Sequence, residues 1–225
     1  MVKKYSVGIL LVVTLLVSYL SFPQQKVQFS TDFVKDQTID QLLTIATLWG
    51  ILIITIIYNR VVEKENLLIW TEKKYNFKFI LKSCIIVYFV SVVSAGIFNF
   101  IISELTNEGI STMVGEMATV FRSSYLLLII TCITAAITEE FLMRGYIQPR
   151  LSKIYQNPWV GILGTSLIFG VLHSTYGTLG QIVGPFITGI IFSFFYYRYQ
   201  NITILIIVHF IIDFISLNID QFAKY

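Results

Sequence analysis

Residues 124–146 read SYLLLIITCITAAITEEFLMRGY, an apolar run that ends in two glutamates and an arginine. A helix that crosses a bilayer needs about 20 mostly apolar residues, and this stretch has that length. An ionisable side chain inside such a span is costly unless it faces the protein interior or water. The segment therefore predicts a membrane helix bundle whose interior receives Glu139, Glu140 and Arg144.

Composition supports the membrane class for the whole chain. The 225 residues are 56% hydrophobic and 13% charged, about half the charge of an ordinary soluble domain. We expect an all-α, polytopic membrane helix bundle of about seven transmembrane helices with a four-helix core that carries the polar groups. The predicted spans are residues 5–22, 41–59, 79–103, 123–147, 158–174, 178–197 and 202–218. A net charge of +3, scattered along the chain, gives no indication of nucleic-acid binding.

Lysine and arginine residues predict the orientation. With the N-terminus in the cytoplasm, only Lys26, Lys35, Arg122 and Lys224 fall outside, which agrees with the positive-inside rule. Residues 60–78 are then a cytoplasmic loop. The first span lacks a small-residue cleavage site, so we expect an uncleaved anchor and a multi-pass protein of the cell membrane.

Ionisable residues inside the predicted spans are concentrated in the second half of the chain. The predicted organisation is three N-terminal spans over 1–120, a polar-residue-bearing helix bundle over 121–218 and a short tail over 219–225. Cys84 and Cys132 lie in apolar runs and are expected to be buried hydrophobic side chains.

Helical spacing separates the roles of the two glutamates. Glu140 and Arg144 are four residues apart, so they share a helix face and can form an ion pair with a purely structural role. Glu139 is rotated by about 100° from Glu140 and must face another partner. Glu139 is therefore the carboxylate without a local partner.

The chain has two histidines, and both lie in predicted spans. Phe169 precedes His173 by one helical turn, where its ring can fix the histidine rotamer. His209 precedes Asp213 by the same distance. Each element alone is consistent with helix–helix hydrogen bonding. Their conjunction with Glu139 on three helices favours a functional site.

This set of residues is suited to peptide hydrolysis without a covalent intermediate. A carboxylate and a neutral imidazole can deprotonate a water molecule, and a further histidine with a polar neighbour can stabilise an oxyanion. The sequence has no H-E-x-x-H, its GTSL at 164–167 does not form G-x-S-G, and Asp213 has no aspartate partner in a span. A zinc site built from His173, His209 and Glu139 matches in ligand type.

Three motifs, EEFLMR, FGVLH and HFIID, occur in the order and spacing of E-E-x-x-x-R, F-x-x-x-H and H-x-x-x-D/N. Over residues 120–218 the chain thereby resembles the CAAX protease and bacteriocin-processing (CPBP, or ABI) family of intramembrane endopeptidases. The resemblance implies that Glu139 and His173 activate water, that His209 and Asp213 form the oxyanion side, and that Glu140 and Arg144 support the site. Eukaryotic relatives usually have asparagine where this chain has Asp213.

One geometric condition follows from the motif positions. Glu139 lies about 12 Å from a membrane edge at Ile147, whereas His173 lies about 22 Å from Pro158, at 1.5 Å per residue. We therefore expect Pro149 to end or bend the fourth helix, part of 147–160 to lie along the interface, and the fifth span to start late. A cavity open to the cytoplasm would then reach both residues.

The predicted function is cleavage of membrane-associated peptides or proteins, in bacteriocin or peptide-signal processing or in self-immunity. The predicted partners are a peptide or protein substrate and the lipid bilayer, with no nucleic acid. No cofactor is expected, and zinc is disfavoured because His173 has few second-shell acceptors nearby on its own helix. The alternative is a non-enzymatic membrane immunity or binding protein of the same fold. A proton-coupled transporter is disfavoured because the chain lacks two repeated halves with broken helices.

Overall fold

The structure is a computed structural model that describes residues 2–21, 33–109 and 111–222. Helices and their connections make up the described residues, without strands, as the sequence predicts. The α-helices are α1 (Val2–Ser21), α2 (Phe33–Tyr58), α3 (Phe77–Thr106), α4 (Thr112–Ser123), α5 (Tyr125–Glu140), α6 (Gln148–Tyr155), α7 (Pro158–Leu172), α8 (Gly180–Tyr199) and α9 (Ile202–Phe222). Two π-helical segments, η1 (Asn59–Glu63) and η2 (Phe141–Ile147), and a 3-10 turn, η3 (Ser174–Tyr176), complete them.

Six helical segments are long and apolar enough to cross a membrane, and α9 contributes a shorter apolar helix over Ile202–Asn218. The six are Val2–Tyr19, Gln37–Glu63, Phe77–Thr106, Tyr125–Tyr155, Pro158–Tyr176 and Gly180–Tyr199. The chain is thus a multi-pass membrane protein. The difference from the predicted seven spans lies in α9, whose apolar part is shorter than the other six.

The fourth span differs from its prediction at its second end. The helix does not stop near Ile147 but continues through η2 and α6 to Tyr155. Pro149 is accommodated because it follows the π-turns, where Gln148 N–H bonds the Met143 carbonyl five residues back and the register returns to α. The helix therefore does not end at Pro149.

The fifth span also starts without delay, contrary to the prediction. Pro158 is the first residue of α7, and the Asn157 side chain caps it by accepting from Trp159 N–H at 2.9 Å. Measured along the helices, Glu139 now lies about 24 Å from Tyr155, and His173 about 22 Å from Pro158. The longer fourth helix therefore brings both residues to similar depth without an interfacial segment.

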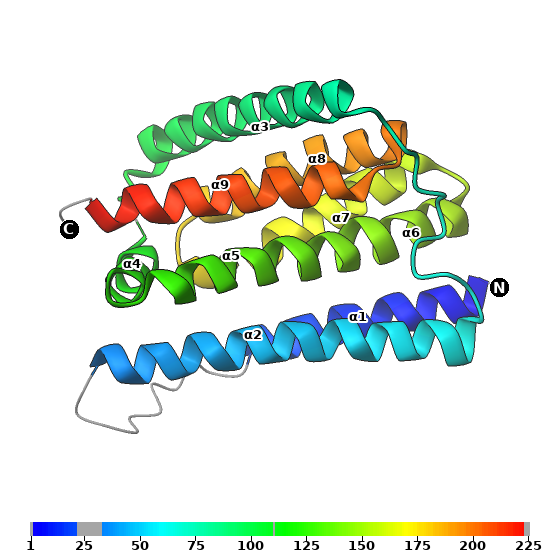
Figure 1. The fold of residues 1–225 in the computed structure, drawn as a ribbon, viewed down its shortest axis with the longest axis horizontal. Coiled ribbons are helices and arrows are strands. Elements are labelled where there is room, and N and C mark those ends of the chain that lie inside the picture. The colour runs from blue at the N-terminus through cyan, green and yellow to red at the C-terminus, as the bar shows by residue number, and fades with distance from the viewer. Residues whose placement is uncertain (1, 22–32, 110, 223–225) are drawn as a thin grey trace.

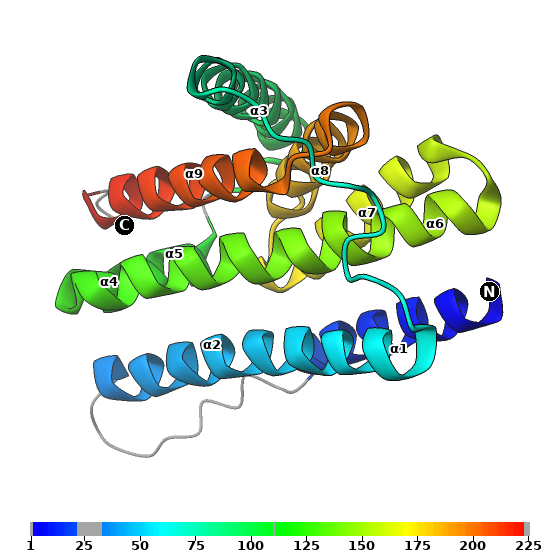
Figure 2. The same ribbon diagram turned by 45° about the vertical axis from the view of Figure 1, so that its right-hand side comes forward.

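The helices are arranged around α5 and its continuation into α6. α1 and α2 form a pair on one side, packed against α5 and α6, and α3 lies on the opposite side against α8 and α9 (Figure 1). α9 packs along α5, and α7 packs between α6 and α8. Figure 2 shows the same arrangement from a second direction, with α3 above α8 and α9, and α1 and α2 below α5.

Close approach of α7 and α8 depends on glycine. A Cβ atom added to Gly170 would lie 2.9 Å from the Ile182 carbonyl oxygen, and one added to Gly189 would lie 3.1 Å from Ser166 Cα. The two backbones therefore touch at these positions, as small residues allow between membrane helices. This contact fixes the end of α7, where His173 follows.

One end of the bundle collects the N-terminus, the α2–α3 connection, the α6–α7 turn and the α8–α9 turn (Figure 1). We call it the basic end, because most of the lysines and arginines of the described residues lie in or next to these elements. α4 and the second end of α9 lie at the opposite end.

The α2–α3 connection, residues 64–76, fixes the start of α9 at the basic end. The Glu72 carboxylate accepts from Ile202 N–H at 2.7 Å and from the Tyr196 hydroxyl at 2.8 Å. Lys73 N–H donates to the Gln200 carbonyl at 2.8 Å. Because α9 begins at this anchor, its residue 209, two helical turns later, has a defined depth in the bundle.

Candidate active site

The ion pair between Glu140 and Arg144 forms as the spacing predicts. Arg144 Nη1 lies 2.9 Å from Glu140 Oε1, and both side chains are buried. The guanidinium also lies over the Phe169 ring at 4.7 Å and the Phe192 ring at 5.3 Å. Stacking between aromatic faces stabilises a cation that has lost its water. Arg144 therefore joins α5, α7 and α8 through one side chain.

His209 connects this pair to α9. Its Nδ1 lies 2.8 Å from Glu140 Oε1, so one carboxylate oxygen is shared by Arg144 and His209. Its Nε2 lies 3.4 Å from Asp213 Oδ2 and 3.8 Å from Glu139 Oε2. Both ring nitrogens thus face carboxylate oxygens, which only accept hydrogen bonds when ionised.

Sequence analysis paired His209 with Asp213, and it missed Glu140 as a partner. The i, i+4 spacing does bring Asp213 within 3.4 Å, but the shorter contact is with Glu140 on a different helix. The two residues are 69 positions apart, and only helix packing brings them together. No local sequence pattern could have indicated this contact.

Burial divides the cluster into an enclosed and an accessible part. The side chains of Glu140 and Arg144 are 0% and 1% exposed, and that of His209 is 9% exposed. Glu139 and Asp213 retain 22% and 29%. The accessible carboxylates are therefore the ones next to His209 Nε2, and Glu139 has no closer charged partner than this nitrogen among the described residues.

His173 lies at the end of α7 rather than inside it. It is the residue that follows Leu172, with φ −89° and ψ 1°, and it opens the η3 turn. Its Nδ1 lies 2.8 Å from the Phe169 carbonyl oxygen. A carbonyl only accepts, so Nδ1 carries the proton of the neutral ring and Nε2 is left as the acceptor.

Two aromatic rings hold His173 in place. Phe169 lies 4.7 Å from it, centroid to centroid, as the one-turn spacing predicted, and Tyr176 stacks on it at 5.7 Å and 26°. Phe169 also meets the His209 ring edge-on at 6.1 Å. Among the described residues, His173 forms no hydrogen bond or ion pair with Glu139, and the Phe169 ring, which contacts both His173 and His209, links His173 to the cluster.

Tyr176 and Tyr19 are polar residues of this region that sequence reasoning missed. The Tyr176 ring stacks on His173 at 5.7 Å, and Tyr19 packs against the core cluster that contains Phe169. The Tyr19 hydroxyl bonds Thr44 Oγ1 at 3.0 Å. Tyrosines on a terminal helix and in a short turn carry no spacing signal toward His173 or Phe169, so the sequence could not have indicated them.

The donor arrangement does not fit a zinc ion. Zinc sites use about four ligands at about 2.0–2.3 Å. Within the described residues no group of three or more His, Cys, Asp or Glu side chains is arranged to hold a metal. His209 turns Nδ1 to Glu140 and Nε2 to Asp213, which leaves no nitrogen directed toward a shared ligand position with His173. The predicted zinc alternative gains no support from this geometry.

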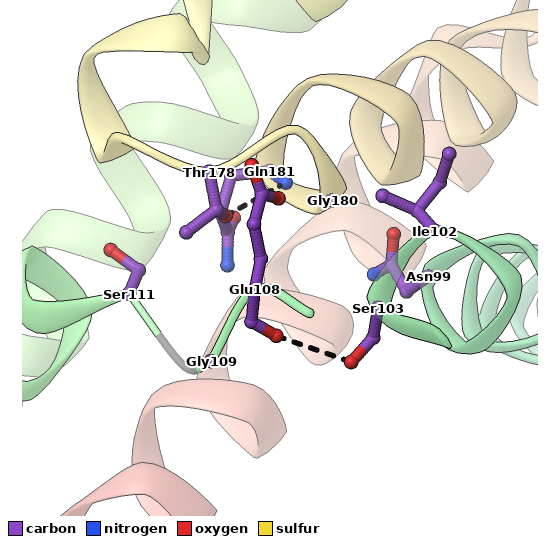
Figure 3. A pocket seen from close by; sticks show the side chains of 9 residues that line it. All are labelled: Asn99, Ile102, Ser103, Glu108, Gly109, Ser111, Thr178, Gly180 and Gln181. Atoms are coloured by element: carbon purple, nitrogen blue, oxygen red, sulfur yellow. Dashed lines mark hydrogen bonds between the residues drawn. The ribbon is translucent and has the colours of Figure 1, made fainter. Parts of the chain in front are cut away.

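A separate pocket of about 300 Å³ lies between α3 and the start of α8. Asn99, Ser103, Glu108 and Gln181 are among its lining side chains (Figure 3). Glu108 Oε2 accepts from Leu179 N–H at 2.7 Å, so the pocket wall also fixes the turn before α8. None of the cluster residues lines this pocket.

These features define a class: a polytopic helical membrane protein with a carboxylate–histidine cluster inside its bundle. Among known families, the model described as Type II CAAX prenyl endopeptidase Rce1-like matches residues 121–215. The resemblance indicated by the three motifs is thereby confirmed for residues 121–215, which are similar to the CAAX-protease-type intramembrane proteases. No curated protein and no solved structure matches the chain.

Proposed function

We propose that this chain is an intramembrane endopeptidase that hydrolyses peptide bonds of membrane-associated peptides or proteins, with water activated by Glu139 and His173. The observation that supports it is the division of one charge cluster. Glu140 and Arg144 are fully enclosed, while the adjacent Glu139 side chain is 22% exposed and lies 3.8 Å from His209 Nε2, its nearest charged partner among the described residues. A carboxylate in that condition is available as a general base.

In the proposed reaction, Glu139 takes a proton from water while the water oxygen attacks the carbonyl carbon of the scissile bond. His173 accepts a second hydrogen bond from the same water through Nε2, because Nδ1 is already bonded to Phe169. When the tetrahedral intermediate breaks its C–N bond, the proton held by Glu139 passes to the leaving nitrogen. One water is consumed, and an acid and an amine are released.

His209 is proposed to stabilise the negative charge that develops on the carbonyl oxygen. Its Nδ1 is held by Glu140, so only Nε2 faces the accessible side of the cluster. A positioned donor at that point acts on the transition state more than on the substrate. No step of this mechanism passes through a metal.

The proposed setting is the cell membrane with the N-terminus in the cytoplasm. The basic end then faces the cytoplasm, in agreement with the positive-inside rule. The Ile-, Lys-, Tyr- and Phe-rich composition is typical of an AT-rich bacterial genome, so bacteriocin leaders, peptide pheromones and membrane-protein segments are the proposed substrates rather than prenylated proteins.

The test compares membrane peptides released by cells that express the wild-type chain, the Glu139→Gln variant or the Glu104→Gln variant. Glu104 is an exposed glutamate of α3, so its substitution is a matched control. We expect a set of peptides that disappears with Glu139→Gln and persists with Glu104→Gln. Identical peptide sets in all three strains would contradict the protease function. Retained immunity to a bacteriocin in the Glu139→Gln strain would then identify a binding protein.

A further inference from the structure

His209 is held by one short hydrogen bond and two longer contacts. Its Nδ1 lies 2.8 Å from Glu140 Oε1, whereas its Nε2 lies 3.4 Å from Asp213 Oδ2 and 3.8 Å from Glu139 Oε2. Both longer distances exceed the roughly 2.7–3.2 Å of an ordinary N–H···O hydrogen bond. A ring that is bonded firmly at one atom can still pivot about that bond. The direction of Nε2 must therefore be set by the groups that pack against the ring.

Two phenylalanine rings pack against the imidazole of His209. Phe169 of α7 and Phe192 of α8 each lie 6.1 Å from it, centroid to centroid, at interplanar angles of 86° and 73°. Near-perpendicular pairs of this kind are a favourable arrangement of aromatic rings. The Arg144 guanidinium lies over the same two rings, at 4.7 and 5.3 Å. The two phenylalanines therefore contact both of the side chains that bond Glu140 Oε1.

Phe169 contacts both histidines, whereas Phe192 contacts one of them. Phe169 also packs against His173 at 4.7 Å, and it belongs to the second sequence motif. Among the described residues, Phe192 forms no ring contact with His173. Its helix, α8, carries none of the motif residues, so the sequence gave no reason to select it. A change at this position therefore acts on His209 and Arg144 and leaves the contacts of His173 in place.

The position of Phe192 is fixed by the packing of α8 against α7 and α6. Gly189, three residues earlier on the same helix face, brings the α8 backbone against Ser166. The carbonyl of the next residue, Ser193, accepts from Gln148 Nε2 at 2.7 Å. The Phe192 side chain itself is 1% exposed. Its backbone is therefore anchored to both neighbouring helices within one helical turn of the ring.

We propose that Phe192 is a positioning residue of the active site, which holds the imidazole of His209 so that its Nε2 faces the scissile carbonyl. The same ring excludes water from Arg144, and charges attract more strongly where water is excluded, so the pair with Glu140 is held more tightly. The Nδ1 bond then fixes one end of the imidazole, and Phe192 fixes its tilt. The expected effect on turnover rests on the proposed endopeptidase function, whereas the orientation of His209 does not depend on any substrate.

The first experiment compares two identical substitutions on α8, in the full-length chain in detergent micelles, with a synthetic copy of a peptide whose release depends on Glu139. Phe192→Leu and Phe195→Leu each replace a buried ring by a smaller apolar side chain, and Phe195 packs against Tyr199 near the basic end. Both should lower Tm by a similar amount, because each loses comparable packing. We expect Phe192→Leu to lower kcat by about ten- to hundredfold, with KM changed less than about threefold. Phe195→Leu, the matched control, should keep kcat per folded molecule within about threefold of wild type.

The second experiment measures the hydrogen bond of the His209 ring without any substrate. The chain has two histidines, so a protein with isotope-labelled histidine rings gives few nuclear magnetic resonance signals, and a His173→Gln variant assigns those of His209. The Nδ1 proton of His209 is bonded to Glu140 in a buried position, so it should exchange slowly with water. We expect this proton signal to be lost in Phe192→Leu and retained in Phe195→Leu.

The two experiments together decide the role of Phe192. Equal kcat in the two leucine variants, a retained Nδ1 proton signal in Phe192→Leu, or loss of that signal in both variants would overturn the proposal. If Phe192→Leu does not stay folded in detergent, Phe192→Met, which has a similar volume without a ring, takes its place. If no peptide depends on Glu139, the endopeptidase function fails, and the Nδ1 proton signal still decides whether Phe192 positions His209.

Discussion

Two buried charge clusters in this bundle have similar residues, but they differ in how many of their polar atoms are hydrogen-bonded. The first joins Glu63 of η1 to Arg150 of α6 near the basic end, and the second joins Glu140, Arg144 and His209 deeper in the bundle. Both contain a fully buried arginine–glutamate pair. They differ in how many polar atoms around the pair have partners.

In the first cluster every nitrogen of Arg150 has an acceptor. Nε and Nη2 bond Glu63 Oε2 at 2.8 and 2.6 Å, Nη2 also bonds Asn59, and Nη1 donates to the Leu67 and Tyr146 carbonyls. The other oxygen of Glu63 accepts from the Tyr146 hydroxyl at 2.7 Å. A network completed in this way fixes one arrangement of α2, α6 and the connection that follows α2.

In the second cluster polar atoms are left over. Arg144 Nε and Nη2 and Glu140 Oε2 are buried and have no hydrogen-bond partner among the described residues. Glu139 and Asp213 are partly exposed beside them. Buried polar atoms are nearly always paired in native proteins, so unpaired ones call for a functional explanation. The contrast agrees with a structural role for the first cluster and with the proposed role of the second in holding water and substrate.

The largest expected effect is on turnover. Glu139→Gln removes the proposed base but keeps size and polarity, so kcat should fall by about 10²–10⁴ while Tm stays unchanged. Purified variant and wild type are compared with a peptide substrate and by thermal unfolding. A Glu139→Gln enzyme with near-normal kcat would mean that the base has been assigned to the wrong residue.

The matching change in the first cluster should act on stability. Glu63→Ala leaves Arg150 buried without its carboxylate, which typically costs about 3–5 kcal/mol of unfolding free energy. Unfolding in detergent measures the loss, and kcat per folded molecule should remain within about threefold of wild type. A Glu63→Ala protein with wild-type stability and lost turnover would reverse the contrast between the clusters.

Glu140→Gln tests whether the second cluster combines both properties. Glutamine can still accept one bond from Arg144 or His209 but carries no charge for either. Stability should fall by about 1–3 kcal/mol and kcat by about tenfold, because His209 loses its orientation. Calorimetric and kinetic measurements on one preparation separate the two effects. A change in stability alone would show that Glu140 has no part in positioning His209.

Asp213→Asn should have a smaller effect than Glu139→Gln. Asparagine keeps an acceptor oxygen near His209 Nε2 and gains a donor, so activity should be retained within about tenfold of wild type. His209→Ala, which removes the ring that Glu140 holds, should lose nearly all activity in the same assay. Equal loss in both variants would indicate that the negative charge of Asp213 is required.

The smallest effect is a difference in labelling that places the two clusters relative to the membrane. The buried Cys84 and Cys132 are first replaced, and a single cysteine is then introduced as Lys74→Cys or Thr106→Cys. Lys74 lies just before the start of α3 and Thr106 at its end, and both are exposed. An impermeant maleimide added to intact cells should label residue 106 and spare residue 74. The reverse pattern would invert the topology and place the Glu63–Arg150 cluster outside.

Much of the fold could be predicted because a bilayer restricts which secondary structures can span it. Apolar length identifies spans, and the predicted ranges agree with the helices found, including 158–174 and 178–197 against α7 and α8. The error at 147–160 arose because Pro149 was assumed to interrupt a regular α-helix. Instead, the π-helical segment before Pro149 lets the helix continue past the proline. The register of this segment depends on tertiary contacts around residues 141–147.

The sequence by itself determined the membrane class, the pairing of Glu140 with Arg144 and the packing of the Phe169 ring against His173, because these rest on hydropathy and on the 3.6-residue period. Only the tertiary structure decided that Glu140 also bonds His209 and that the Tyr176 ring lies on His173. It also decided that all nitrogens of Arg150 have hydrogen-bond acceptors while two of Arg144 have none among the described residues. The contacts of His209 and Arg150 join residues on different helices, and that of Tyr176 depends on a tight turn beyond a helix end. Their distances are set by packing and backbone reversal, which no periodic pattern along the chain encodes.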